Sequence, residues 1–379
     1  MTPKDILTNP AFCPMPWTGL MYNFDGAVKN CIRSAEVLGN IKDNTIEEIV
    51  LGDNNNIRQS MIANRIHPSN CTPCHELEVG KNSFDIISDR KFYIRELKQV
   101  PLDTYSRVPN FELHTIDVRW TNLCNFACTY CGPKFSSKWA EELKVKQDVP
   151  TEEQRAAFKE YIFKHAGQLK HVYLAGGEPL LMKENLELLD LLDPDVNLRI
   201  NTNLSKVDTQ VFDRICKFKN VHWIVSAETV EHEYEYIRYG GKWDDFLDNL
   251  ITIKKLNHKI SFNMLHFLLN YKSVFGCVDY FKSMGFHNNA FIIGPLLTPL
   301  YLNIRHLPNA VLAEVGAILE QRINDKPGYL LEDSYRNMLA YIQQPFDKNL
   351  QQSLQEIAEL DQRRGLDSSK IFKELYGYR

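Results

Sequence analysis

The stretch Thr121–Pro133, TNLCNFACTYCGP, places Cys124, Cys128 and Cys131 within eight residues. A structural metal site normally takes four protein ligands, whereas a catalytic site keeps one position open for a small molecule. The run follows a predicted strand, residues 114–120, and so lies at the carboxyl end where parallel βα folds carry their catalytic loops. Three thiolates in a C-x3-C-x2-C loop can hold a [4Fe–4S] cube with one iron open. A zinc loop with a fourth ligand from elsewhere, or chance spacing, is the alternative.

The composition is that of an ordinary globular protein. Of 379 residues, 44% are hydrophobic and 24% are charged, which is enough chain for two or three domains. The formal net charge of −4 gives no general attraction for nucleic acid. The N-terminus lacks the apolar core of a signal peptide, and no apolar run approaches the roughly 18 residues of a membrane-spanning helix. We therefore expect a cytoplasmic protein with neither a membrane nor a nucleic-acid partner.

The chain has nine cysteines, which we do not expect to form disulfides. Thiols stay reduced inside cells, so metal binding or core packing must account for them. Cys216 and Cys277 stand alone among apolar neighbours. We interpret both as small hydrophobic residues of the core.

From residue 113 onward, short apolar runs alternate with longer amphipathic patterns. This alternation predicts a parallel βα architecture, and each connection is long enough for a right-handed crossover. Helix signals lie between the apolar runs; Thr151 and Gln154, for example, form a capping box. The predicted strands are residues 114–120, 171–176, 197–203, 221–227, 259–267 and 289–295.

The cysteine loop resembles that of the radical S-adenosylmethionine (SAM) superfamily. Its CX3CXΦC pattern is matched by Cys124, Cys128, Tyr130 and Cys131. The resemblance implies that the three thiolates hold a [4Fe–4S] cluster, that SAM chelates the open iron, and that Tyr130 lies in the cofactor site. It also implies an α/β fold with a partial (β/α)6 barrel, and an electron donor such as a flavodoxin or a ferredoxin.

The segment AGGEPLL, at the end of the second predicted strand, resembles the superfamily's GGEP segment, which binds the methionine amino group. The resemblance assigns SAM contacts to Gly176, Gly177, Glu178 and Pro179. Glycines let a ligand approach the backbone closely, and a carboxylate complements an ammonium group. GGE alone is usually only a turn, but here it follows the cysteine loop by one strand.

Two further segments match the superfamily less fully. Thr202 and Asn203 of NTNLS resemble its TNG sequence, with Leu204 in the place of the glycine. VSAETVEHEYEYIRYG resembles its VSLDG segment and a following arginine; Ser226 and Arg238 match, and the three residues after Ser226 differ. The resemblance implies that all four matching residues contact SAM, Ser226 through the ribose or carboxylate. Ordinary polarity of a strand end or a helix surface is the alternative.

A second set of cysteines lies near the N-terminus: Cys13, Cys31, Cys71 and Cys74. FDG is a hairpin turn signal between the flanking segments TGLMYNF and AVKNCI. Four thiolates can close a zinc site or saturate a [4Fe–4S] cube, and spacing alone does not choose between them. The arrangement resembles the twitch domain, a shortened SPASM auxiliary-cluster domain, which here precedes the barrel instead of following it. The resemblance favours a second [4Fe–4S] cluster over zinc.

The sequence thus predicts four consecutive regions. They are a twitch-like α+β cluster domain (1–80), a helix and linker (81–112), a radical SAM partial barrel (113–300) and a C-terminal helical extension (301–379). No ligand pattern occurs in the extension, which we expect to pack against the barrel or a partner.

The resemblance implies reductive cleavage of SAM to a 5′-deoxyadenosyl radical, which removes hydrogen from an unactivated C–H bond. A four-thiolate auxiliary cluster has no free iron, so electron transfer is its expected role and a net oxidation is favoured. A peptide or protein substrate is slightly favoured over the dehydrogenation or rearrangement of a small molecule such as a sugar, an aminocyclitol or a nucleotide. We expect no room before Cys13 for a leader-peptide-binding module. A non-catalytic iron–sulfur electron carrier is the alternative of another class. The sequence assigns no catalytic acid or base.

Overall fold

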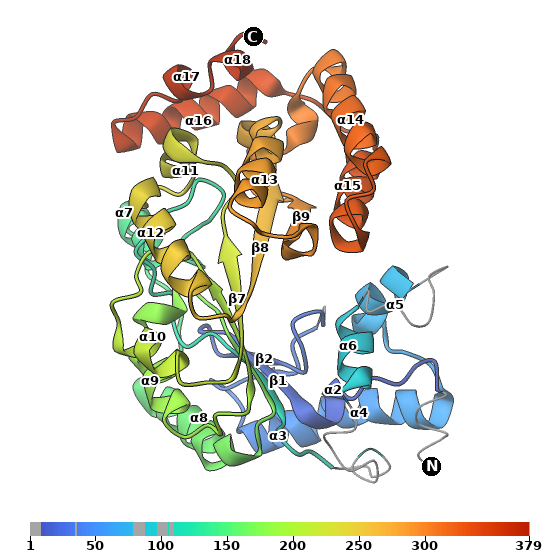
Figure 1. The fold of residues 1–379 in the computed structure, drawn as a ribbon. Coiled ribbons are helices and arrows are strands. Elements are labelled where there is room, and N and C mark those ends of the chain that lie inside the picture. Colours follow the sequence, from blue (N-terminus) through green and yellow to red (C-terminus); the bar gives the residue numbers. More distant parts are fainter. Residues whose placement is uncertain (1–8, 35, 79–87, 97–104, 106–109, 379) are drawn as a thin grey trace. The chain divides into compact units, whose positions relative to one another are not determined.

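The computed structural model describes residues 9–34, 36–78, 88–96, 105 and 110–378 (Figure 1). The chain forms two compact units. Unit 1 consists of Met1–Asn122, Lys146–Ile200 and Gln210–Val221, and unit 2 of Leu123–Val145, Asn201–Thr209 and His222–Arg379. These units interleave along the chain, whereas the four regions predicted from the sequence are consecutive; the bounds of those regions stay a prediction.

Unit 1 contains a sheet in which an N-terminal hairpin extends the first barrel strands. Its strand order is β3-β2-β1-β4-β5-β6. The predicted hairpin is confirmed, because β1 and β2 pair antiparallel with Tyr22 opposite Val28. The parallel pairing of β1 with β4, Gly19 opposite Thr115, was not predicted. The strands are β1 (Gly19–Tyr22), β2 (Ala27–Lys29), β3 (Gly39–Asn40), β4 (Thr115–Val118), β5 (His171–Leu174) and β6 (Asn197–Thr202, whose last two residues fall in unit 2).

The helices of unit 1 show the expected start signals. The predicted capping box is confirmed at α8, where the Thr151 hydroxyl accepts a hydrogen bond from the Gln154 N–H and the Gln154 side chain accepts one from the Thr151 N–H. Of the predicted helix and linker, α6 (Asp89–Arg95) is present, and residues 79–87, 97–104 and 106–109 lie outside the described residues. The other helices are α2 (Met15–Thr18), α3 (Ile46–Leu51), α4 (Asp53–Gln59), α5 (Thr72–Glu78), α8 (Glu152–Lys164), α9 (Lys183–Leu189) and α10 (Gln210–Ile215).

Unit 2 contains the last three strands, which pair in the order β7-β8-β9 and run parallel. Its core includes Phe262 of β8, whose ring stacks on Phe281 and Phe291 with centroid distances of 4.2 and 5.3 Å. All six predicted barrel strands are therefore confirmed. The elements are β7 (Asn220–Ser226, whose first two residues fall in unit 1), β8 (Lys259–His266), β9 (Phe291–Pro295), α7 (Ser137–Leu143), α11 (Glu231–Ile237), α12 (Trp243–Lys254) and α13 (Ser273–Ser283).

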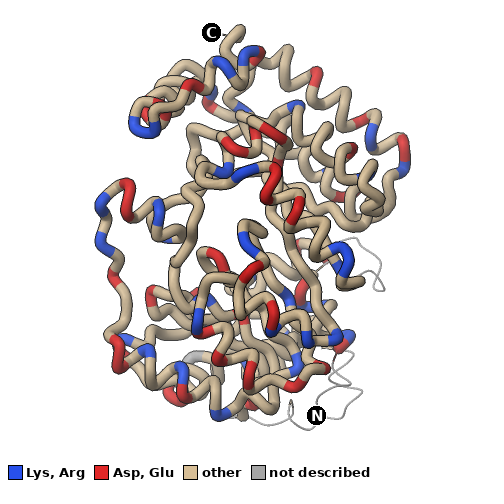
Figure 2. The backbone as a smooth tube through the Cα atoms, turned by 60° about the vertical axis from the view of Figure 1, so that its left-hand side comes forward, with Lys and Arg blue, Asp and Glu red and all other residues tan. Residues whose placement is uncertain are grey.

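The predicted C-terminal helical extension is confirmed and belongs to unit 2. Its first two helices form a pair, and Ser334 of α15 accepts a hydrogen bond from the Ile293 N–H of β9 at 3.1 Å. Lys and Arg are interspersed with Asp and Glu along the described chain (Figure 2). Within the described ranges, no helix has the length and apolar character needed to span a bilayer. The helices are α14 (Asn309–Asn324), α15 (Tyr329–Ile342), α16 (Leu350–Arg364), α17 (Ser368–Ile371) and α18 (Lys373–Tyr376).

Candidate functional site

The three cysteines of the opening stretch lie together in unit 2. Cys124 and Cys128 are buried, and the partly buried Cys131 packs with them around Phe126. The half-buried Tyr130 completes this group. The loop therefore gathers the three predicted thiol ligands and the predicted aromatic residue in one apolar environment.

Helix α7 holds the cysteine loop through its first turn. The Ser137 hydroxyl donates to the Cys124 carbonyl oxygen and accepts from the Cys124 N–H, both at 3.1 Å. The Trp139 indole N–H donates to the Cys128 carbonyl oxygen at 2.7 Å. These bonds satisfy buried backbone groups of Cys124 and Cys128 and so fix the loop. They do not involve the sulfur atom of either cysteine.

A glycine lets a second segment run close beside the loop. The Ala127 N–H donates to the Tyr239 carbonyl oxygen at 2.8 Å. The next residue, Gly240, has a φ of +102°, and a Cβ there would lie 3.0 Å from the Asn125 carbonyl oxygen. Only glycine combines this backbone conformation with so close an approach.

A buried ion pair touches the sulfur of Cys128. Arg238 donates from Nε and Nη2 to the two carboxylate oxygens of Glu228 at 2.9 and 2.7 Å, and its Nη1 lies 3.9 Å from Cys128 Sγ. The Tyr130 hydroxyl donates to Glu228 at 3.1 Å. Arg238 is 3% exposed and Glu228 1%, so Arg238 does not lie on an exposed helix surface, and that alternative is wrong. Burial raises the pKa of the Cys128 thiol, and the Arg238 guanidinium opposes that rise.

Glu228 was missed in the sequence, where it counted only as a departure from the VSLDG pattern. The available signal was an acidic side chain two residues after the end of a strand, with an arginine ten residues later. Nothing local in the sequence shows that these two residues, Glu228 and Arg238, form a bidentate pair.

The segment that matches TNG also reaches the cysteine loop. The Asn203 side-chain amide donates to Asn125 at 3.2 Å and lies 3.8 Å from Cys124 Sγ. The Leu204 N–H donates to the Thr202 hydroxyl at 2.8 Å, and Leu204 itself has a φ of +55°. The backbone therefore needs a left-handed residue where the superfamily has glycine, and the buried Leu204 adopts that conformation.

Ser226 ends β7 opposite Asn263 of β8 and is half-buried. This position, at a carboxyl strand end, is where the sequence predicted it. The contact of Ser226 with SAM stays a prediction.

The GGEP segment lies in unit 1 and forms a tight turn after β5. Gly176 has a φ of +114°, and a Cβ there would lie 3.0 Å from the Thr121 carbonyl oxygen. The fully buried Glu178 accepts a hydrogen bond from the Leu180 N–H at 3.1 Å and so caps the short turn Pro179–Leu181. The GGE residues thus form the turn that such a sequence usually indicates. The SAM contacts of Gly176, Gly177, Glu178 and Pro179 stay a prediction.

The four N-terminal cysteines gather in unit 1. Cys13 and Cys74 are buried, and Cys31 and Cys71 are partly buried. Burial raises the pKa of Cys13 well above its ordinary value, and the other three thiols raise it further. The hairpin and the later C-x2-C segment are thus brought together, as the sequence predicted. The surrounding apolar residues are Phe12, Met15, Trp17, Ile57, Met61 and Tyr105.

Both cysteine groups offer what an iron–sulfur cluster needs from a protein: thiols, apolar surroundings and, in unit 2, N–H donors near sulfur. In the described part of the chain, no three His, Cys, Asp or Glu side chains are arranged to hold a metal ion. The ligand sets of the two proposed clusters therefore stay predictions from the sequence.

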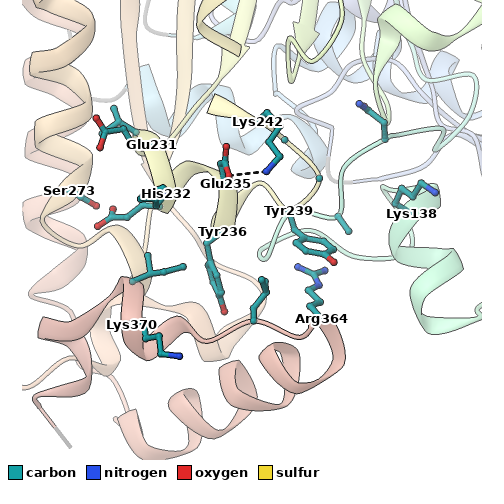
Figure 3. A pocket seen from close by; sticks show the side chains of 18 of the residues that line it. Lys138, Glu231, His232, Glu235, Tyr236, Tyr239, Lys242, Ser273, Arg364 and Lys370 are labelled. Atoms are coloured by element: carbon teal, nitrogen blue, oxygen red, sulfur yellow. Dashed lines mark hydrogen bonds and ion pairs between the residues drawn. The ribbon is translucent and has the colours of Figure 1, made fainter. Parts of the chain in front are cut away.

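A cavity of about 1310 Å³ lies in unit 2, with Asn125 and Ala127 of the cysteine loop in its wall. Figure 3 labels other residues of its lining, among them Tyr239 and Arg364. Arg364, at the end of α16, lines it, stacks 4.3 Å from the centroid of the Tyr239 ring and pairs with Glu142 of α7 at 3.0 Å. The C-terminal extension thus forms part of a cavity that the cysteine loop also borders.

Comparison with known proteins gives two family matches. A model of the radical SAM superfamily matches residues 118–294, and a SPASM model, an iron–sulfur cluster-binding domain, matches residues 13–75. The first segment contains Cys124, Cys128 and Cys131, and the second contains the four N-terminal cysteines.

Individual relatives align over part of their length. The chain is 42% identical over 77 residues to 7-carboxy-7-deazaguanine synthase of Clostridium acetobutylicum, covering 20% of this chain and 31% of that protein. It is 24% identical over 167 residues to GTP 3′,8-cyclase of Campylobacter lari, covering 43% and 48%. The match thus spans less than half of either relative. The solved structure of anSMEcpe with bound AdoMet is 18% identical, with a TM-score of 0.43, over 56% of this chain and 60% of that one.

The six βα strands, the cysteine spacing and the two family matches agree. The fold is a partial (β/α)6 barrel with a small N-terminal α+β domain and a C-terminal helical extension. The chain carries a radical SAM domain over residues 118–294 and, before it, a SPASM iron–sulfur cluster-binding domain over residues 13–75.

Proposed function

We propose that the chain is an enzyme that reductively cleaves SAM and removes hydrogen from an unactivated C–H bond of its substrate. The observation that carries this proposal is the buried cysteine loop, with Arg238 and Asn203 beside two of its sulfur atoms, inside the radical SAM match. When bound, the cluster and SAM supply the electron and the 5′-deoxyadenosyl radical. The protein supplies orientation, electrostatics and exclusion of water.

We assign the SAM-binding cluster to Cys124, Cys128 and Cys131. Arg238 has its Nε and Nη2 on Glu228 and its Nη1 beside a thiol, so we assign it to the cluster surroundings instead of to SAM. The remaining cofactor contacts are proposed for Tyr130, Gly176, Gly177, Glu178, Pro179, Thr202, Asn203 and Ser226.

We propose a second [4Fe–4S] cluster on Cys13, Cys31, Cys71 and Cys74. Four thiolates leave no open iron, so this cluster accepts an electron and does not bind substrate. We therefore propose a net oxidation of the substrate, in which the substrate radical passes one electron to this cluster. Zinc at this site is the alternative, and it would make the N-terminal site structural.

The proposed substrate is a peptide or protein, in a cytoplasmic enzyme reduced by a flavodoxin or ferredoxin. A small anionic molecule is a second candidate, supported by the relative named GTP 3′,8-cyclase and by a polar row of side chains in unit 1 described below. A non-catalytic electron carrier is disfavoured, because electron transfer alone does not need a cluster in which one iron has an open coordination position.

Anaerobic reconstitution followed by iron, zinc and 5′-deoxyadenosine measurement tests the proposal. The parent should hold about eight irons per chain and release 5′-deoxyadenosine with SAM and a strong reductant. Cys128→Ala should lose one cluster and all SAM cleavage, whereas the matched control Cys216→Ala, outside both cysteine groups, should behave like the parent. SAM cleavage by Cys128→Ala at the parental rate contradicts the assignment.

The same preparation separates the alternatives. Intact clusters without 5′-deoxyadenosine would favour the electron carrier. Four irons with one zinc would make the N-terminal site structural. With two iron clusters, Cys71→Ala should still release 5′-deoxyadenosine but form little oxidised product once a substrate is known; full product formation would reject the electron-acceptor role.

A further inference from the structure

A row of polar side chains crosses the sheet of unit 1. Asp117 of β4 is the register partner of Tyr173 of β5, and Tyr173 is the register partner of Arg199 of β6. Register partners on neighbouring parallel strands place their side chains on the same face of the sheet. The three side chains therefore share one face, at one level.

One positive charge in this row, that of Arg199, has no ion-pair partner among the described residues. Arg119 donates to both carboxylate oxygens of Asp117 at 3.2 Å, so these two charges compensate each other. Arg199 takes part in no ion pair with a described residue, and its Nε is buried without a hydrogen-bond partner. Its guanidinium carbon lies 5.2 Å from the centroid of the Tyr173 ring. The row as a whole thus carries the uncompensated charge of Arg199.

The neighbouring groups do not neutralise Arg199. Burial, and then the Arg199 guanidinium, lower the pKa of His171 to about 4, so His171 is uncharged at neutral pH. The rings of Phe92 and Tyr93 on α6 pack against His171 with centroid distances of 5.7 and 5.9 Å. Arg199 therefore meets aromatic and neutral groups, and the Asp117 carboxylate, with which it interacts electrostatically, is already hydrogen-bonded to Arg119.

A guanidinium N–H that is buried without an acceptor has lost its water and gained nothing in exchange. An anion that accepts from it removes that cost. The planar fork of arginine matches the paired oxygens of a carboxylate or a phosphate. We propose that Arg199 binds an anionic group of the substrate, a carboxylate or a phosphate, beside the Tyr173 ring. This inference rests on the proposed function and deepens it by naming a chemical class of substrate.

The location of this anion site fits an oxidation. Tyr93 packs against His171 on one side and against the apolar group that contains Cys13, Cys31 and Cys71 on another. One aromatic side chain therefore connects the surroundings of Arg199 with the proposed electron acceptor.

The test is anaerobic calorimetric titration of the reconstituted protein with inorganic phosphate and, separately, with succinate. The parent should bind one of the two at one site per chain. Arg199→Gln should weaken that binding at least tenfold, and Arg199→Lys should retain more phosphate binding than the Gln variant because it keeps the charge. The control is Arg155→Gln, which removes an arginine of α8 that pairs with the exposed Glu152, and it should bind like the parent.

The two probes distinguish the sources of the anion: phosphate binding indicates a phosphorylated substrate, and succinate binding a carboxylate. Circular dichroism and iron content confirm that each variant is folded and loaded. If the parent binds neither anion, or if Arg199→Gln binds as tightly as the parent, the inference is overturned. The titration needs no reductant, so it tests the anion site separately from SAM cleavage. A parent that binds the anion but releases no 5′-deoxyadenosine would instead contradict the proposed function.

Discussion

Replacing Arg238 by Gln should lower the reduction potential of the SAM-binding cluster, and replacing Glu228 by Gln should raise it. Arg238 presents Nη1 at 3.9 Å from Cys128 Sγ, whereas Glu228 holds the other side of the same guanidinium. Reduction adds negative charge to the cluster. The nearby cation favours the reduced form, and the carboxylate disfavours it.

The size of the effect follows from the contact distance. A unit charge at about 4 Å interacts with roughly 4 kcal/mol at an effective dielectric constant of about 20. The added electron spreads over a four-iron cluster and Glu228 opposes Arg238, so we take roughly a third of this energy, about 1.4 kcal/mol. For a one-electron couple that is a tenfold change in the oxidised-to-reduced ratio, or about 59 mV. Arg238→Gln should lie lower by about this amount, and Glu228→Gln higher by a similar or smaller amount.

The assay is an anaerobic redox titration followed by electron paramagnetic resonance, in a Cys71→Ala background that leaves one cluster. Tyr130→Phe is the matched control, because it removes one hydrogen bond to Glu228 and keeps both charges. Iron content must match the parent in every variant. Equal potentials, or shifts of the same sign in Arg238→Gln and Glu228→Gln, would refute the electrostatic reasoning. A packing defect would not shift the reduction potential in opposite directions in the two variants.

Three further predictions concern stability. Gly240→Ala should destabilise by about 1–3 kcal/mol in urea unfolding, because of its positive φ and the contact with the cysteine loop, while Gly276→Ala, which meets open space in α13, should not. Trp139→Phe should cost about 1–3 kcal/mol by the same measurement, because the buried Cys128 carbonyl loses its indole donor. Burial lowers the pKa of His266 to about 4, so the folded state binds fewer protons than the unfolded state between pH 4 and 6.5. His266 thus makes stability fall as the pH falls through that window, by up to about 3 kcal/mol, and urea midpoints of His266→Gln at pH 7 and 5 should show a smaller fall.

Local patterns made most of the fold predictable. The barrel strands are short apolar runs separated by amphipathic helical patterns, and the capping box that begins at Thr151 is complete within four residues. The hairpin needed only the FDG turn. The pairing of β1 with β4 was not predictable in this way, because it joins segments almost a hundred residues apart and leaves no periodic signal in either.

Within the candidate site, too, contiguous motifs were predictable and contacts between distant residues were not. The cysteine loop is a contiguous motif, so its spacing was enough to show the resemblance to the radical SAM superfamily. The burial of Arg238 depends on a carboxylate ten residues earlier and on a thiol of a distant loop, so no pattern along the chain marks it. The substitution of Leu204 for the expected glycine was visible, but its backbone conformation was not.

Strand β6 shows how a partial barrel can be both a core and a site. Its sequence NLRINT alternates, with Leu198 and Ile200 buried on one face and Arg199 on the other. A closed parallel barrel fills its interior with branched apolar side chains, and an arginine there would leave donors unsatisfied. In this chain the Arg199 level also holds Asp117 and Tyr173, so polar side chains share one face of the sheet across three neighbouring strands. Such a row is stable only if a ligand or water meets its charge, which is the physical reason for assigning Arg199 to substrate binding and not to stability.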